Sequence, residues 1–270
     1  MYNFARLPAL HNAVWLGREA AVTSLIAKGA NVEARAGSKR WTPLHIAAMG
    51  GETAIVTLLL ANGADVEARD EDGWTPLSFA TTNRRDRVVA LLIAAVADAN
   101  ARDRDGQPLL HFAIQYGQEE IVKQLIDKGA DVNARDRLGR TSLHCVVDDS
   151  PLSDFYVNGY QEAIVKLLLA NDVNVNARDT NEFTPLHVAV KHRLEAIVKQ
   201  LLDKGADVEA KTGSKRWTPL HVAVMEGQAA MVKLLIASGA DIEARHKDGW
   251  TPLYYAITYG RKAMVNVNSG

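Results

Sequence analysis

The chain lacks the cysteine pairs, long apolar runs and secretory signal that mark disulfide-bonded, membrane and secreted proteins. It holds one cysteine in 270 residues, so no disulfide can form within it, and we expect Cys145 to be a buried, small apolar side chain. No run of about 18 apolar residues could span a bilayer. The start lacks a basic segment followed by a long apolar stretch. We therefore expect a soluble protein of the cytosol or nucleus, with no membrane partner.

The balance of basic and acidic residues disfavours a nucleic-acid partner. Thirty-one basic and 32 acidic residues leave a formal net charge of −1. A nucleic-acid binder needs a basic stripe, so no nucleic acid is expected as the partner. Nucleophile elbows, phosphate-cradling glycine loops and HExxH spacings are missing too. Asp148 and Asp149 are adjacent carboxylates beside Ser150, a pattern that often occurs by chance. We predict no enzymatic activity, no catalytic residue, no metal site and no cofactor.

What the chain does have is a repeat. The phrase Thr42-Pro43-Leu44-His45 returns at a spacing of 33 or 34 residues. Its close copies are Thr75-Pro76-Leu77, Thr184-Pro185-Leu186-His187, Thr218-Pro219-Leu220-His221 and Thr251-Pro252-Leu253, and its weaker copies begin at Pro8, Pro108 and Thr141. A period of this length indicates an array of small units that share one continuous core.

One unit predicts a turn followed by two helices. The turn begins at Asp70 and includes Gly73, which is free to adopt a positive φ. Thr75 is placed to cap the first helix, and Pro76 takes the first helical position, where it loses no hydrogen bond. The second helix carries one apolar face, formed by Val88, Val89, Leu91, Leu92 and Ile93.

Most second helices end in Gly-Ala-Asp or Gly-Ala-Asn, and glycine suits a left-handed helix terminus. Val96 and Asp172 replace the glycine in two copies. Because a β-branched residue at positive φ is strained, we expect a different geometry near Val96.

These phrases, in this order, resemble the ankyrin repeat, and the resemblance covers nearly the whole chain. It implies an all-α solenoid of about eight helix-turn-helix units with β-hairpin fingers, in a single domain over residues 1–270. The units are anchored near Leu10, Leu44, Leu77, Leu110, Leu143, Leu186, Leu220 and Leu253. The resemblance also implies that the histidine of each phrase bonds between adjacent turns, since one histidine per unit lacks the close spacing of a zinc site.

The array departs from its own pattern twice. The step from Leu143 to Leu186 is ten residues longer than usual, and we place the insertion at residues 150–159. It carries Phe155 and Tyr156, so it is either a functional loop or a neutral insertion whose aromatics fold back onto the scaffold. The last unit, 246–270, is truncated in its second helix, and we expect its final residues to be poorly ordered.

The candidate surface is the residue before each Thr-Pro pair, which faces the groove in the family. Large aromatics there are typical binding anchors, although they also pack within the turn. We predict partner contacts at Trp41, Trp74, Arg140, Phe183, Trp217 and Trp250, at the inner-helix ends Met49, Tyr116, His192, Met225 and Tyr259, and at Phe155 and Tyr156.

Two blocks are close copies, residues 37–45 and 213–221. A segmental duplication explains them, and two equivalent binding patches are the alternative. Both blocks are basic at their tips, with Lys39 and Arg40 in one and Lys215 and Arg216 in the other. This pattern suggests a partner surface of mixed charge.

We therefore expect a monomeric, non-catalytic scaffold or adaptor that binds another protein through its concave face and fingers. Two alternatives remain open. In the first alternative, the chain is the interaction region of a larger protein or of an effector from an intracellular microbe, and the activity lies elsewhere. In the second, which the net charge disfavours, the chain binds nucleic acid.

Overall fold

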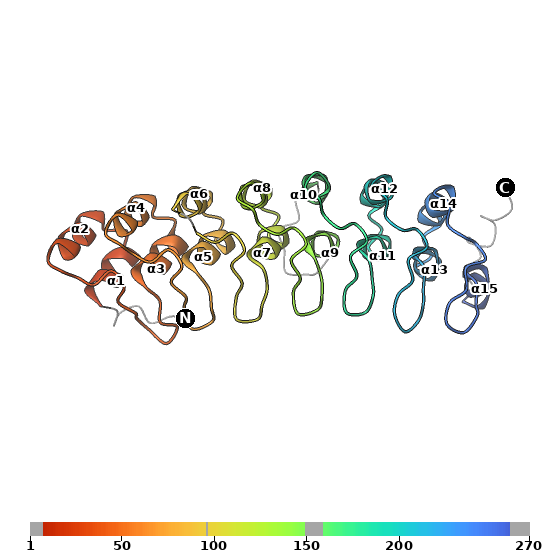
Figure 1. The fold of residues 1–270 in the computed structure, drawn as a ribbon, viewed down its shortest axis with the longest axis horizontal. Coiled ribbons are helices and arrows are strands. Elements are labelled where there is room, and N and C mark those ends of the chain that lie inside the picture. Colours follow the sequence, from red (N-terminus) through yellow and green to blue (C-terminus); the bar gives the residue numbers. More distant parts are fainter. Residues whose placement is uncertain (1–7, 96, 149–158, 260–270) are drawn as a thin grey trace. The chain divides into compact units, whose positions relative to one another are not determined.

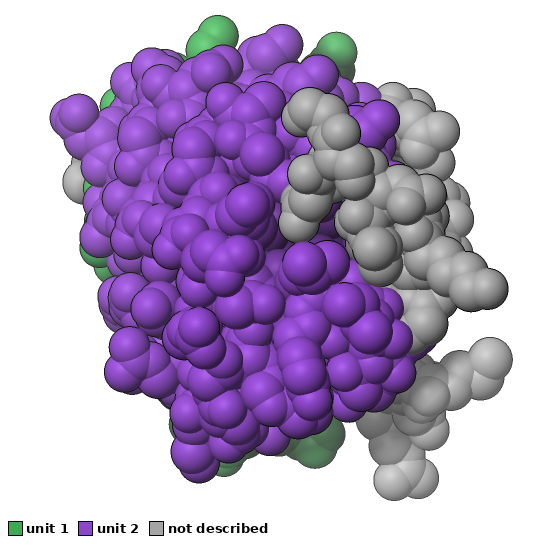
Figure 2. All heavy atoms as spheres, turned by 90° about the vertical axis from the view of Figure 1, so that its right-hand side faces the viewer, with its two compact units in different colours: residues 1–131 green, residues 132–270 purple. Residues whose placement is uncertain are grey.

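The computed structural model describes residues 8–95, 97–148 and 159–259. Contacts divide the chain into two compact units, Met1–Asp131 and Val132–Gly270 (Figure 2). Each unit is all-helical in its described part.

The first unit contains four helix pairs. Their bounds are α1 (Ala9–Trp15), α2 (Glu19–Ala27), α3 (Pro43–Gly50), α4 (Thr53–Ala61), α5 (Pro76–Thr82), α6 (Asp86–Ala94), α7 (Leu109–Gln115) and α8 (Glu119–Asp127). The odd-numbered helices contact one another in chain order, and so do the even-numbered helices (Figure 1). The unit is therefore two parallel layers of helices, an inner layer on the side of the long turns and an outer layer away from them.

The second unit repeats this arrangement. Its described helices are α9 (Ser142–Val147), α10 (Tyr160–Leu169), α11 (Pro185–Lys191), α12 (Glu195–Asp203), α13 (Pro219–Met225), α14 (Ala229–Ala237) and α15 (Pro252–Thr258). Here α9, α11, α13 and α15 form the inner layer, while α10, α12 and α14 form the outer layer (Figure 1). Residues 260–270, where the second helix of the last repeat was expected, lie outside the described residues.

The inner helices begin as the sequence predicts. Thr75 has extended backbone angles, and its hydroxyl accepts a hydrogen bond from the backbone N–H of Ser78. Pro76 takes the first helical position, where an N–H has no partner inside the helix. The same cap precedes α3, α11 and α13, with Thr42, Thr184 and Thr218.

The core lies between the two layers. Inner helices are buried almost all round; Leu44, Ala47 and Ala48 of α3 are inaccessible to solvent. Outer helices bury one stripe only, such as Val88, Val89, Leu92 and Ile93 of α6. Small alanines let neighbouring inner helices approach closely, because bulk there would overpack the stack.

The end of α10 shows which backbone conformation a residue takes where it replaces the usual glycine. Gly205 ends α12 with a φ of 84°, and Asp172 takes the same left-handed region after α10 with a φ of 51°. Aspartate tolerates this conformation because its short side chain can bond locally. Val96 lies outside the described residues, so the geometry expected there stays a prediction.

The turns between repeats are hydrogen-bonded loops. Ala36 pairs with Trp41, and Arg102 pairs with Pro108, as isolated bridges; no longer strand occurs within the described ranges. Residues 149–158, which include Phe155, Tyr156 and nearly all of the insertion expected at 150–159, lie between α9 and α10 and are outside the described part. None of the helices in that part combines the length and apolarity needed to cross a membrane.

Candidate partner-binding surface

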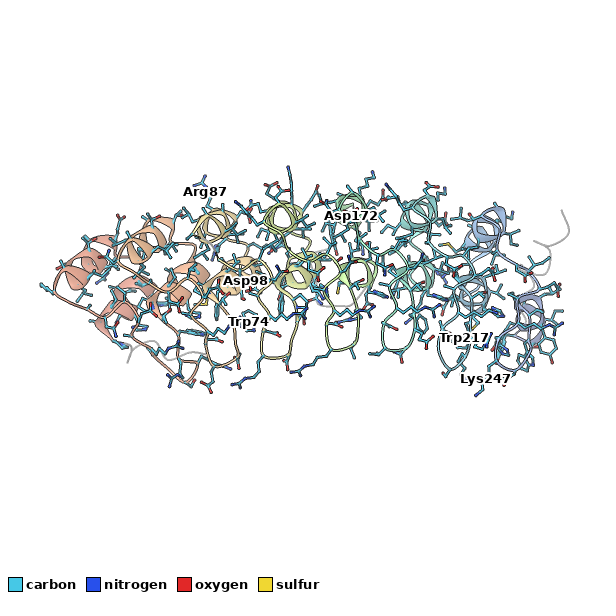
Figure 3. All side chains as sticks on the ribbon, in the orientation of Figure 1. Trp74, Arg87, Asp98, Asp172, Trp217 and Lys247 are labelled. Atoms are coloured by element: carbon cyan, nitrogen blue, oxygen red, sulfur yellow. The ribbon has the colours of Figure 1, made fainter. Side chains whose placement is uncertain are left out.

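Several of the long turns are shaped by one acceptor side chain. In the turn before α5, Oδ1 of Asp70 accepts the backbone N–H groups of Asp72 and Trp74, both at 2.9 Å. Asp136 and Asp179 do the same in later turns. These bonds hold Trp74, Arg140 and Phe183 at the base of their turns. Figure 3 shows Trp74 and Trp217 there and Lys247 nearer a tip.

The histidines of the repeat phrase connect successive repeats, as the resemblance implied. Nε2 of His45 lies 3.0 Å from the carbonyl oxygen of Trp74, one repeat further on. Four more histidines make the same contact to the residue before the next threonine: His11 to Trp41, His144 to Phe183, His187 to Trp217 and His221 to Trp250. The backbone that carries the candidate row is therefore held by the preceding inner helix.

The tautomer of these histidines follows from their second contact. The backbone N–H of Thr184 donates to Nδ1 of His187, and that of Thr218 donates to Nδ1 of His221. An Nδ1 that accepts leaves the proton on Nε2, which donates to the carbonyl. Burial lowers the pKa of both rings to about 4, partly opposed by the carbonyl bond. Burial likewise lowers the pKa of His11, His45 and His144. All five rings are neutral structural groups at neutral pH.

In the first unit the aromatic row packs into a ladder. The rings of Trp41 and Trp74 both meet Phe79 edge-on, with centroids 5.5 and 5.4 Å apart, and Trp74 also meets Phe112 at 5.2 Å. The indole N–H of Trp41 donates to Oδ2 of Asp70 at 3.1 Å. Trp41 is only 7% exposed, whereas Trp74 is half-buried. Phe79 and Phe112, which sequence reasoning did not single out, follow the buried leucine of their own phrases by two residues.

In the second unit the row is more open. Phe183, Trp217 and Trp250 hold the position before three successive threonines, and all three are half-buried. Trp250 lies among His246, Tyr254 and Tyr255, with ring centroids 4.6 to 5.6 Å away. The second unit therefore keeps three aromatic side chains partly exposed at this position of successive repeats.

The predicted inner-helix ends differ in exposure. Met49, Tyr116, His192 and Met225 are half-buried, while Tyr259 is 63% exposed. Tyr259 stacks on Tyr255, with a centroid distance of 5.6 Å.

Arg140 interrupts the aromatic row with a charged cluster in the second unit. Its guanidinium donates to Asp136 at 2.8 Å and to Asp148 at 3.0 Å. Nε2 of His192 lies 3.6 Å from the other oxygen of Asp148. Burial raises the pKa of Asp136, but the hydrogen bonds and charge of Arg140 outweigh it and hold that pKa below its usual value. The structure thus brings Arg140, Phe183 and His192 together around one pocket of about 190 Å³.

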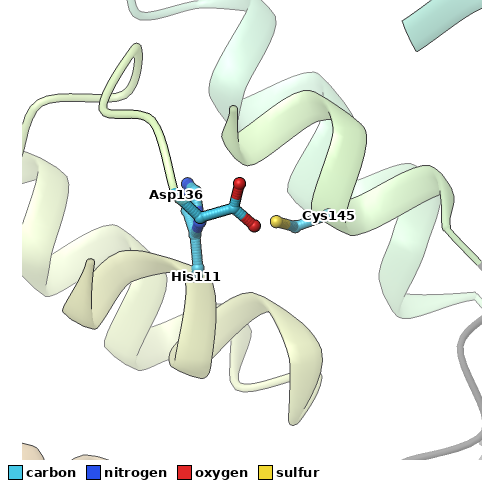
Figure 4. Close-up of side chains that lie close together, drawn as sticks. All are labelled: His111, Asp136 and Cys145. Atoms are coloured by element: carbon cyan, nitrogen blue, oxygen red, sulfur yellow. The ribbon is translucent and has the colours of Figure 1, made fainter. Parts of the chain in front are cut away.

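Cys145 is the buried apolar residue that the sequence predicts. It lies on α9, and the carboxylate of Asp136 faces it (Figure 4). Burial, together with the charges of Asp136 and Asp148, raises the pKa of its thiol to about 12, although Arg140 acts in the opposite direction. A thiol of this kind is a poor nucleophile at neutral pH.

We expect Cys145 to be inert toward a thiol reagent such as dithionitrobenzoate in the native protein. At pH 8 the buried group stays protonated, because its pKa is about 12. The reaction, followed by absorbance, should become stoichiometric only in urea. Rapid, complete labelling without denaturant would show that the thiol is accessible and ionised.

The family model described as "Ankyrin repeats (3 copies)" matches residues 10–103, 86–153, 147–212 and 209–267. Among solved structures, the chain is similar to the ankyrin repeat domain of Bcl-3, described as a unique member of the IkappaB protein family. The two share 30% identity with a TM-score of 0.73, over 86% of this chain and all of the other. A comparison with curated proteins finds no match.

Ankyrin repeats are generally protein-interaction modules without catalytic activity, and the match to Bcl-3 fits this. The family model spans nearly all of the described residues, and the helix pairs, capped inner helices and histidine contacts are those of the repeat. The chain belongs to the ankyrin-repeat family.

Proposed function

We propose that the chain is a non-catalytic scaffold that binds a protein partner along its inner helices and turns. The observation that carries this proposal is the half-exposed row Phe183, Trp217 and Trp250. Leu186 and Leu220 of the second unit are buried, whereas these three aromatic side chains stay partly exposed. Large, rigid aromatics that remain partly exposed beside a packed scaffold are typical interface anchors.

In the first unit the proposal relies on Trp74 more than on Trp41. Trp41 is almost fully covered and its indole N–H is bonded to Asp70, so it has little surface left to offer. Met49 and Tyr116 extend the candidate surface of the first unit at its helix ends. His192, Met225 and Tyr259 extend that of the second unit, where Arg140 adds a charged position.

The proposal includes the architecture that such a surface needs. We propose eight repeats with hairpin turns, acting as one domain and as a monomer. Seven helix pairs and α15 within the described residues support the repeat count, and the backbone pairing of Ala36 with Trp41 supports the hairpin form. Phe155 and Tyr156 remain predicted contacts.

The test compares two triple variants by affinity capture and mass spectrometry. Replacing Phe183, Trp217 and Trp250 with alanine removes most of the aromatic surface of the row in the second unit. We expect the recovery of bound proteins to fall at least about tenfold, since interface anchors of this type contribute about 2 kcal/mol or more each. The matched control replaces the exposed residues Lys199 and Lys233 of α12 and α14, together with Lys166 of α10, and should retain binding.

Circular dichroism establishes that both variants are folded. Undiminished recovery of the same proteins by the folded aromatic variant would remove this row from the binding surface.

A further inference from the structure

The duplicated turns differ in how their charges are neutralised. The first copy places Lys39 and Arg40 opposite three acidic residues of the next turn, Asp70, Glu71 and Asp72. At the matching positions the second copy has Lys215 and Arg216, followed by His246, Lys247 and Asp248. Two of the three acidic positions have therefore become histidine and lysine.

In the first copy each carboxylate has a partner within the unit. Lys39 binds Asp72 at 2.6 Å, the indole N–H of Trp41 binds Asp70 at 3.1 Å, and Arg104 lies 3.7 Å from Glu71. The position equivalent to Lys215 and the position equivalent to Trp217 thus hold carboxylates when the chain supplies them.

The second copy lacks these internal partners. The side chains of Lys215, Arg216 and Lys247 are exposed and make no ion pair with any residue in the described part of the chain. The two lysines lie on adjacent turns, because the backbone N–H of Lys247 donates to the carbonyl of Lys215 at 3.0 Å. Asp248, the one acidic residue that remains, lies beside His246 at 3.8 Å. The tips of these two turns are therefore a compact cationic patch.

His246 explains the changed environment of Trp217. Its Nδ1 accepts the backbone N–H groups of Asp248 and Trp250, the role that Oδ1 of Asp70 has in the first copy. Aspartate has a second oxygen for the indole, but Nε2 of a ring that accepts at Nδ1 carries a proton and cannot accept. The indole N–H of Trp217 is left without an acceptor among the described residues.

A pocket lies beside the patch. It has a volume of about 410 Å³ and is lined by the turn before α11, by residues 212–215 and by Trp217. Its wall combines the aromatic rings of Phe183 and Trp217 with Lys215 and the hydroxyl of Ser214. The lining also includes Glu182, whose carboxylate pairs with Arg178 at 3.1 Å, so Lys215 is left to bind the anionic end of a side chain.

We infer that the turn tips formed by Lys215, Arg216 and Lys247 bind an acidic peptide segment of the partner, through its aspartate or glutamate carboxylates. The inference rests on the proposed function and specifies the chemistry of the partner at this end of the surface. The first copy does not form such a site, because its own carboxylates already occupy the equivalent lysine and tryptophan.

The test measures binding of a fluorescein-labelled octaglutamate peptide to the full chain by fluorescence anisotropy at low salt. We expect saturable binding that weakens as salt is added, because exposed ion pairs are screened. The double variant Lys215→Ala/Lys247→Ala should weaken binding of the peptide by about two- to thirtyfold, the loss expected for two exposed ion pairs. The matched pair in the first copy, Lys39→Ala/Glu71→Ala, should leave the affinity unchanged.

Two exchanges sharpen the comparison. His246→Asp/Lys247→Glu copies the first turn into the second and should abolish peptide binding. Asp70→His/Glu71→Lys does the reverse and should create a second equivalent of bound peptide.

The inference would be overturned if Lys39→Ala/Glu71→Ala lost as much affinity as Lys215→Ala/Lys247→Ala, or if the peptide did not bind at all. Tighter binding of a single-stranded DNA oligonucleotide of equal charge would also overturn it, by assigning the patch to nucleic acid. None of these outcomes affects the aromatic capture experiment, which decides the proposed function separately.

Discussion

Lowering the pH from about 7 to about 4.5 is expected to unfold the protein, and the buried histidines are the reason. The pKa values of His187 and His221 are about 4 in the folded chain and 6.5 in its unfolded form. At a pH between the folded and unfolded pKa values, these two histidines are protonated in the unfolded chain but not in the folded chain. The stability that these rings contribute is thus complete above pH 6.5 and is lost as the pH falls toward 4.

The effect is large because it is repeated. Each such histidine removes about 1.4 kcal/mol of stability per pH unit inside that window, so His187 and His221 together remove about 3. His11, His45 and His144 act in the same direction, since burial lowers their pKa values as well. Domains are stable by only about 5–15 kcal/mol, so the loss of about 6 kcal/mol over two pH units equals the whole margin at the lower end of that range.

Urea unfolding at a series of pH values, followed by circular dichroism, measures this effect. The midpoint should fall steeply below pH 6.5 and stay level between pH 7.5 and 8.5, where neither state binds a histidine proton. His187→Asn should be less stable at pH 7, because its contacts to Thr184 and Trp217 change, but its pH slope should be shallower by about one proton. A midpoint that does not change between pH 7 and 5 would show that the histidines titrate normally.

Leu186→Ala is expected to destabilise the protein by about 2–5 kcal/mol, the largest effect of any single side chain that we predict. Leu186 is fully buried in α11, which packs against α9 on one side and α13 on the other. Truncation leaves a cavity that two flanking helices cannot both close, so the loss includes the transfer free energy and the cavity.

Leu253 is the matched control, since it holds the same position of the repeat phrase. It lies on α15, whose only inner-layer neighbour among the described helices is α13, and it is half-buried. Leu253→Ala should therefore cost about 1 kcal/mol or less. Urea midpoints of the two variants decide the matter; equal losses would mean that position in the phrase, and not burial, sets the contribution.

The repeat phrase was enough to predict the helices and their order. Thr75 and Pro76 start α5 for local reasons, a hydroxyl cap and a proline that loses no hydrogen bond, and such reasons are visible in the sequence. The apolar faces of the outer helices were equally readable, because helical periodicity decides which side is buried.

The candidate surface was only partly predictable. The charged cluster of Arg140, Asp148 and His192 joins residues up to 52 positions apart, so no local sequence pattern predicts it. Arg140 was noticed only as a position in the row. The position of His192 beside Asp148 depends on the packing of α11 against α9.

The clearest limit of the sequence is the pair Trp41 and Trp217. Both follow the same four residues, Gly-Ser-Lys-Arg, and precede the same Thr-Pro-Leu-His. The sequence alone determined that both stand at the base of a turn, because turn and helix formation are local. Only the tertiary structure decided that Trp41 is buried, with its indole N–H bonded to Asp70. Trp217 stays partly exposed, and its indole N–H has no acceptor among the described residues. The acceptor comes from the next repeat, 29 residues further on, where Asp70 has an oxygen to spare and His246 has no second acceptor.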